Sequence, residues 1–481
     1  MSVDPYREIT FDKDGDGPAG QAASLASLAR QGVTDLVLLA HGWNSSPSGA
    51  TRLCSDFFAP FPGLLTPGVE AGYAGLIWPS MMFTGEPVPD YRALVTVLPE
   101  KEPVLARITE LLSSAPADER AFAEFGALLR ELTDVPGPDL RGATATRERV
   151  PDFLLADPVE VCALFTEALE AGTGGEGRDD FRGEGAGDGF GEGSGDGDGA
   201  GDGLEEGSGD GFGEGLGEGF GNGFGEGFGD GFEEAFGDGF GEGLKRYWKG
   251  GREALRQATY YVMKKRAGHV GEQGLGPLLA EVARTAPGLR VHLVGHSMGA
   301  RLVAYALRSL PAGVRPVASV TLLQGAFSHY AFAARLPHDP RRSGALRDAQ
   351  YRVRGPVVAC YSRHDSALGV MYPLASRVAG DSASLGGIGI GIGAGAEAGA
   401  EAGSRAGLLG SDDSKWGAIG HDGVQAVPGT PDRSLDAVLR EGVPAAGCVS
   451  VDAAAVVRSH SDILRPELAR VVVSAARMGR A

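Results

Sequence analysis

Ser297 lies at the centre of the pentapeptide G-H-S-M-G, residues 295–299, with a glycine two positions to either side. A serine on a sharp turn from a strand to a helix has a strained backbone, and only small residues two positions away leave room for it. Such a turn raises the hydroxyl above the sheet and directs the N-terminus of the next helix at a developing oxyanion. The spacing therefore predicts that Ser297 is a nucleophile.

The sequence around this serine supplies the strand and the helix that the turn requires. Residues 289–294 are a mostly apolar run, and residues 301–310 have apolar residues at helical spacing. Further short apolar runs, typical of strands buried on both faces, occur at 33–40, 73–78, 317–323, 356–361 and 448–451. Because helical stretches lie between some of them, we predict an α/β fold with a doubly wound, mainly parallel sheet.

The strand and turn around Ser297, together with His41-Gly42-Trp43 after the run at 33–40, resemble the α/β-hydrolase superfamily, near its esterase and lipase branch. The resemblance covers residues 33–80 and 244–465, and it implies the α/β-hydrolase fold. In that superfamily two backbone N–H groups bind the oxyanion.

The resemblance implies particular residues for these two donors. The N–H after the nucleophile belongs to Met298, and the loop after an early strand offers Gly42 or Trp43. The alternative is that His41-Gly42 is only the turn that ends a strand.

The superfamily order of nucleophile, acid and histidine implies Asp365 as the acid. A serine hydroxyl needs a general base that a carboxylate orients. Asp365 follows the run at 356–361, the next-to-last predicted strand. The alternative role for this carboxylate is to cap its own loop or to pair with Arg363.

The same order implies His460 as the general base, because it follows the last predicted strand at 448–451. The chain has nine histidines. His421 is the main competitor, although it follows no convincing strand and adjoins a glycine-rich patch.

The chain divides into four segments by composition. Residues 1–97 are the first part of the predicted core, and 98–171 are a predicted helical insertion or cap. Residues 172–243 are a low-complexity insertion of Gly, Asp, Glu and Phe, which we predict to be disordered because glycine entropy and acid repulsion oppose a compact core. Residues 244–481 are the second part of the core, with a Gly/Ala-rich patch at 380–415 that we predict to be flexible.

The charge of the chain is concentrated in the glycine-rich insertion. Residues 170–243 contain 21 acidic and 2 basic residues, a charge of −19 that equals the formal net charge of the whole chain. Because the remainder is neutral and has no basic stripe, we expect no nucleic acid partner. Calcium binding or association through Phe is the alternative role of this insertion, but it lacks the nonapeptide pattern of calcium β-rolls.

The cysteines and the apolar runs indicate the compartment. The four cysteines, at 54, 162, 360 and 448, have no disulfide or metal-ligand spacing, and we expect them to be buried and reduced. No apolar run reaches the ~18 residues of a membrane span, and residues 1–20 have no signal-peptide pattern. We therefore expect a cytoplasmic protein without a stable membrane span.

The expected chemistry is acyl transfer to water through a Ser-His-Asp triad, with no metal and no cofactor. Trp43, Phe83 and Met298 are either an apolar pocket wall, which favours a small-molecule carboxylic ester, or ordinary core residues. A thioesterase or an amidase has the same machinery. A catalytically inactive protein of this fold that binds or scaffolds unknown protein partners is the second class of function.

Overall fold

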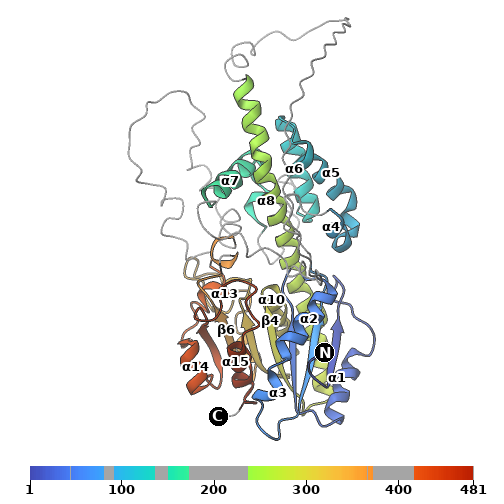
Figure 1. Ribbon diagram of the computed structural model, residues 1–481, viewed down its shortest axis with the longest axis vertical. Helices are drawn as coiled ribbons and strands as arrows, with labels where there is room; N and C mark the ends of the chain where they lie inside the picture. The colour runs from blue at the N-terminus through green and yellow to red at the C-terminus, as the bar shows by residue number, and fades with distance from the viewer. Residues whose placement is uncertain are drawn as a thin grey trace, which may run out of the picture.

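The protein is built around an eight-stranded sheet in which every neighbouring pair of strands is parallel (Figure 1). The computed structural model describes residues 1–43, 45–80, 91–135, 150–172, 237–365, 367–371 and 417–479. The strands, in the sheet order β1-β3-β2-β4-β5-β6-β8-β7, are β1 (Tyr6–Thr10), β3 (Ala71–Ile77), β2 (Asp35–Ala40), β4 (Arg290–His296), β5 (Val317–Leu323), β6 (Pro356–Tyr361), β8 (Gly447–Asp452) and β7 (Asp432–Ser434).

The six predicted strands all lie in this one sheet, which confirms the parallel α/β prediction. The two strands that the sequence did not predict, β1 and β7, are at its edges. β1 mixes polar and apolar residues, and the three residues of β7 are all exposed. Neither strand contains the continuous apolar run that marks a strand buried on both faces.

Helices cover both faces of the sheet because successive side chains of each strand point to opposite sides. In β2, Leu36 and Leu38 pack into one apolar core, whereas Val37 and Leu39 pack into the other. The first core includes residues of α1 (Gln21–Arg30), α9 (Gly276–Thr285) and α10 (Met298–Ser309), and the second includes residues of α2 (Pro47–Phe58), α3 (Phe61–Leu64), α14 (Leu435–Glu441) and α15 (Pro466–Ala476).

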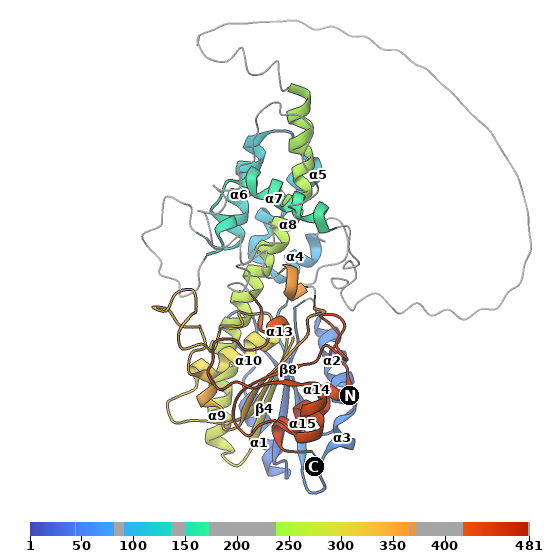
Figure 2. The ribbon, with the colours of Figure 1, turned by 90° about the vertical axis from the view of Figure 1, so that its left-hand side faces the viewer.

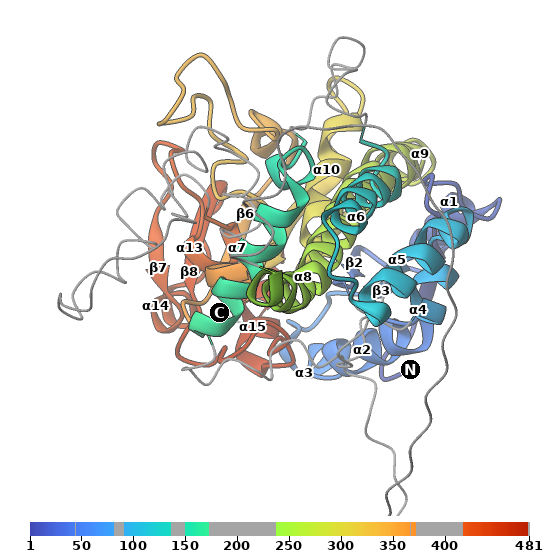
Figure 3. The same ribbon diagram turned by 90° about the horizontal axis from the view of Figure 1, so that it is seen from above.

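A helical unit lies beyond the carboxyl edge of the sheet (Figures 1 and 2). It consists of α4 (Tyr91–Val97), α5 (Glu102–Ser114), α6 (Glu119–Leu132), α7 (Pro158–Gly172) and the upper part of α8 (Gly237–His269). Viewed from above, α8 runs through the middle of this unit (Figure 3). Within the segment predicted as a helical insertion, residues 98–171, the described α-helices are α5, α6 and most of α7.

The beginning of α8 corrects one prediction from composition. Residues 237–243 belong to the segment predicted to be without regular structure, but they are helical. A helix that is already formed extends at the cost of fixing only one further residue for each hydrogen bond gained, so α8 passes the composition boundary. Residues 173–236 and the patch at 380–415 lie outside the described residues. The boundary placed at residue 244 falls inside α8, which packs along α7.

Aromatic side chains hold the helical unit together. The Trp248 ring of α8 stacks on Phe122 with ring centroids 4.2 Å apart, and Phe125 meets it edge-on at 5.4 Å. The indole N–H of Trp248 donates to the carbonyl of Pro116 over 2.9 Å. This ring is buried with its polar atom satisfied, and it belongs to the same apolar core as Leu36 and Leu38 of the sheet.

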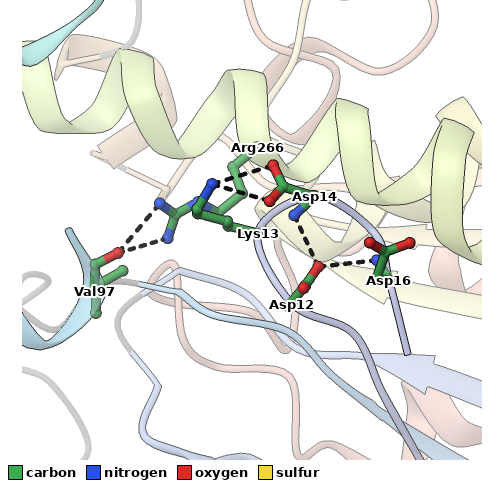
Figure 4. Close-up of polar contacts among 6 residues, drawn as sticks. All are labelled: Asp12, Lys13, Asp14, Asp16, Val97 and Arg266. Carbon is green, nitrogen blue, oxygen red and sulfur yellow. Dashed lines mark hydrogen bonds and ion pairs between the residues drawn. The ribbon is translucent and has the colours of Figure 1, made fainter. Parts of the chain in front are cut away.

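Arg266 joins α8 to the chain that enters the helical unit (Figure 4). Its guanidinium donates to the carbonyl of Pro79 over 3.1 Å and to that of Val97 over 3.2 Å. Burial lowers the pKa of Arg266, while Glu100 and Asp14 oppose this shift. Residues 79 and 97 are therefore held by one side chain of α8.

The cysteines agree with the sequence-based expectation, because all four are free and buried. Among the described residues, no helix combines the length and the apolar character that crossing a membrane requires.

Candidate active site

Ser297 occupies a strained turn between β4 and α10. Its backbone angles are φ 55° and ψ −118°, outside the regions that a non-glycine residue ordinarily adopts. A Cβ atom at Gly295 would collide with the backbone of Gly299 and Ala300, and one at Gly299 would collide with the carbonyl of Ala40. Both glycines of the motif are therefore required by close backbone approach.

Hydrogen bonds on both sides hold the strained serine in place. The Ser297 N–H donates to the carbonyl of Leu323 at the end of β5 over 3.0 Å. The Ser297 carbonyl accepts from Ala326 and from Ala300, each over 3.1 Å. A residue in a sparsely populated conformation persists when its surroundings over-determine it, and these bonds do so here.

The structure brings Ser297, His460 and Asp365 into one hydrogen-bonded chain. His460 Nε2 lies 2.8 Å from Ser297 Oγ, and His460 Nδ1 lies 2.7 Å from a carboxylate oxygen of Asp365. Asp365 is fully buried, whereas the His460 side chain is 16% exposed. Because a carboxylate only accepts, Nδ1 carries the imidazole proton and Nε2 is left to accept from the serine hydroxyl.

The carboxylate is fixed by its own loop as well as by the histidine. Its other oxygen accepts the N–H of Leu368 over 3.0 Å, and its own N–H donates to the carbonyl of Ser362 over 3.1 Å. Arg363, considered from the sequence as a partner of Asp365, instead lies 3.9 Å from Asp452. Asp365 thus caps its loop and orients His460 at the same time.

The rival histidine has other partners. His421 Nδ1 lies 2.7 Å from one carboxylate oxygen of Asp422, and His329 Nδ1 lies 2.8 Å from the other. These two histidines hold the pKa of Asp422 down at about 2, against the effect of burial. The histidine that the structure places against Ser297 Oγ is His460.

The loop after β2 packs directly on the serine turn. A Cβ atom at Gly42 would lie 2.8 Å from His296 Nδ1 and 3.0 Å from Ser297 Cβ, so a larger residue would press on the turn. The Trp78 N–H donates to His41 Nε2 over 3.3 Å, and His41 Nδ1 therefore donates to the Gly42 carbonyl at 2.8 Å.

This bond orients the peptide between Gly42 and Trp43. In a trans peptide the carbonyl and the N–H point in opposite directions, so the bond to His41 turns the Trp43 N–H away from that ring. Burial lowers the pKa of His41 to about 4, and the ring is neutral at neutral pH, as a donor at one nitrogen and an acceptor at the other must be. The sequence showed the position of His41 but not this role.

The three residues considered as a pocket wall differ in the structure. The Trp43 ring is half-buried and meets Tyr260 of α8 edge-on, with centroids 5.3 Å apart. The Met298 side chain is fully buried in the core, which favours the second of the two alternatives for this residue. Its N–H remains a candidate donor, because the first N–H groups of a helix have no partner within it. Phe83 lies outside the described residues.

A second chain of serine, histidine and aspartate lies inside the sheet. His292 of β4 contacts Ser319 Oγ of β5 through Nδ1 and a carboxylate oxygen of Asp35 of β2 through Nε2, each over 2.8 Å. Asp35 also pairs with Arg290 at 2.6 Å. All three members of this chain are at most 1% exposed.

Comparison with known proteins adds no relative. No family model, no curated protein and no solved structure matches the chain. Within the described ranges, no three His, Cys, Asp or Glu side chains are grouped as a metal ion would require.

Proposed function

We propose that the protein is a serine hydrolase of the α/β-hydrolase type that cleaves a small-molecule carboxylic ester. The observation that carries this proposal is the chain Ser297–His460–Asp365, in which one imidazole contacts the serine hydroxyl at 2.8 Å and a buried carboxylate at 2.7 Å. Two features support the superfamily: the parallel sheet, and the order in which the nucleophile, the acid and the histidine follow β4, β6 and β8.

The geometry supports acyl transfer in two half-reactions. Ser297 Oγ forms a bond to the ester carbonyl carbon while His460 Nε2 takes the hydroxyl proton, and Asp365 stabilises the imidazolium. The tetrahedral intermediate then expels the alcohol, which receives that proton, and the acyl group stays on Ser297. Water, deprotonated by His460, attacks the acyl carbon. The second tetrahedral intermediate then breaks its bond to Ser297 Oγ, which takes the proton back from His460, and the carboxylic acid is released.

The oxyanion of each tetrahedral intermediate needs donors that are already in place. The Met298 N–H at the start of α10 is the first candidate. The Trp43 N–H, turned away from His41 by the bond to the Gly42 carbonyl, is the second, and the Gly42 N–H is the alternative in the same loop. The half-buried Trp43 ring provides an apolar surface beside this loop, which favours an acyl or alkyl substrate over a charged one.

The alternative of an inactive binding protein has less support. A residue held at φ 55° and two glycines that exclude any Cβ are costly for folding, and a scaffold has no use for them. Thioesterase and amidase activities share the machinery. The ester is proposed over the amide because an alkoxide leaves more readily than an amine, and the thioester is kept as the alternative chemistry.

The test is covalent labelling followed by turnover. Wild type, Ser297→Ala, His460→Ala and, as a matched control, His421→Ala are treated with a fluorophosphonate probe and assayed with short and long p-nitrophenyl esters. We expect labelling and turnover in wild type and in His421→Ala, and neither in Ser297→Ala nor in His460→Ala. If wild type is not labelled, the hydrolase proposal is wrong and the scaffolding alternative gains support.

A further inference from the structure

We propose that His296 is a positioning residue for the general base, because its Nε2–H holds the backbone carbonyl of His460. This inference rests on the proposed function. His296 Nε2 lies 2.9 Å from the His460 carbonyl oxygen. A carbonyl only accepts hydrogen bonds, so the proton of the His296 ring is on Nε2.

The position of His296 in the chain makes this bond a direct link between nucleophile and base. His296 is the last residue of β4 and immediately precedes Ser297. The rigid strand that carries the nucleophile therefore also fixes the backbone of the base. The two imidazole rings lie 5.2 Å apart, centroid to centroid, with an interplanar angle of 40°.

The surroundings of His296 keep its ring in one protonation state and one orientation. Burial, and then the nearby His460 ring, lower the pKa of His296 to about 3, and the other ionisable groups that act on it are Asp365 and His41. The ring is neutral at neutral pH, with Nε2 as its donor. Gly42 packs against the opposite side of the ring, where no Cβ would fit beside Nδ1.

The base needs such support because it lies in a loop. After β8 ends at Asp452, residues 453–465 form neither helix nor strand before α15 begins. The Val457 carbonyl of this loop accepts from Ser362 Oγ over 2.8 Å, which ties the loop to the strand that precedes the acid. The bond from His296 ties the same loop to the nucleophile. Displacing a catalytic group by about 1 Å costs on the order of 100-fold in rate.

Two amide substitutions separate positioning from packing. Glutamine places an Nε2 donor the same number of bonds from Cα as the histidine Nε2, whereas asparagine places its donor at the position of Nδ1. We expect His296→Gln to retain kcat within about 3-fold, and His296→Asn to lose kcat by about 10- to 100-fold with KM little changed. The initial rate of fluorophosphonate labelling should follow the same order.

The controls distinguish a failure of the positioning role of His296 from a failure of the proposed hydrolase function. Thermal unfolding of both variants shows whether each is folded, and kcat is referred to active serine counted by exhaustive labelling. Equal kcat in folded His296→Gln and His296→Asn, whether high or low, would overturn the positioning role while labelled wild type leaves the hydrolase proposal intact. If wild type is not labelled, the hydrolase proposal itself fails.

Discussion

The sheet carries two hydrogen-bonded chains of side chains, each made of one serine, one histidine and one aspartate. They differ in their position in the sheet, in backbone strain and in exposure. Ser297–His460–Asp365 lies at the carboxyl edge, where the serine is strained and its histidine is 16% exposed. Ser319–His292–Asp35 lies within β5, β4 and β2, with its residues almost fully buried.

The imidazoles of the two chains also carry their protons on different nitrogens. His460 gives Nδ1 to the carboxylate and Nε2 to the serine, whereas His292 gives Nε2 to the carboxylate and Nδ1 to the serine. Ser319 lies in the middle of β5 and does not have a positive φ, so neither a strained turn nor the N-terminus of a helix accompanies it. A hydrogen-bonded Ser-His-Asp chain is therefore not a candidate active site unless a strained turn, N–H donors for an oxyanion and access for a substrate accompany it.

The largest effect should come from removing the two serine hydroxyls in turn. Ser297→Ala should lower kcat for ester hydrolysis by ~10⁶-fold, because the covalent route is lost. Ser319→Ala should stay within about 3-fold of wild type, because its hydroxyl contacts no substrate. Steady-state turnover of p-nitrophenyl esters measures both, and comparable losses in the two variants would contradict the distinction between the chains.

The two carboxylates should differ in what they support. Asp365→Asn should lower kcat by about 10⁴-fold, because the amide no longer fixes the tautomer of His460. Asp35→Asn should leave kcat per folded molecule nearly intact. Turnover per folded molecule provides the comparison, and a nearly active Asp365→Asn would remove this residue from the mechanism.

Asp35→Asn, unlike Asp365→Asn, should affect the stability of the protein more than its kcat. Asp35 is fully buried and bonded to both His292 and Arg290. Its replacement by Asn should lower the unfolding free energy by roughly 1–3 kcal/mol, because the buried His292 loses its carboxylate acceptor and the partly exposed Arg290 loses its ion-pair partner. Urea unfolding at neutral pH measures this change, and an unchanged midpoint would show that the inner chain is not a structural one.

Stability should also depend on pH, through buried histidines in both regions. Burial lowers the pKa of His41 to about 4, of His296 to about 3, and of His292 as well. As the pH falls below about 6.5, these histidines bind protons in the unfolded chain before they do so in the folded protein. Their contribution to the unfolding free energy is therefore complete above that pH, and it is lost as the pH falls towards their folded-state pKa values. Each histidine should contribute up to about 1.4 kcal/mol per pH unit in this window.

Urea unfolding between pH 7 and 5 tests this expectation. His292→Gln should reduce the slope by the contribution of one proton, whereas a stability that is constant from pH 7 to 5 would show that the histidines are not protected from protonation.

The central strands and the serine turn could be predicted because their information is local. Val37 and Val294 lie in short apolar runs, and the two glycines flank the serine at fixed spacing. Asp365 and His460 came from the resemblance to a family, and the structure brings both to Ser297.

The contacts that hold the site are not local, and the sequence did not predict them. The bond between His296 and the His460 carbonyl joins residues 164 positions apart. The role of His41, which follows β2, depends on Trp78, which follows β3. A histidine beside a glycine in each motif was the only signal available, and by itself it does not specify a partner. β1 and β7 were missed because edge strands do not require an apolar run.

The most direct test of the central claim is to locate the adduct of a fluorophosphonate probe by peptide mass spectrometry. The chain offers Ser297 at the carboxyl edge and Ser319 inside the sheet, and both have a histidine within hydrogen-bond distance. We predict one adduct per chain, on the peptide that contains Ser297, and its loss in Ser297→Ala. An adduct on another serine, or no adduct in folded wild-type protein, would contradict the assignment of Ser297 as an activated nucleophile.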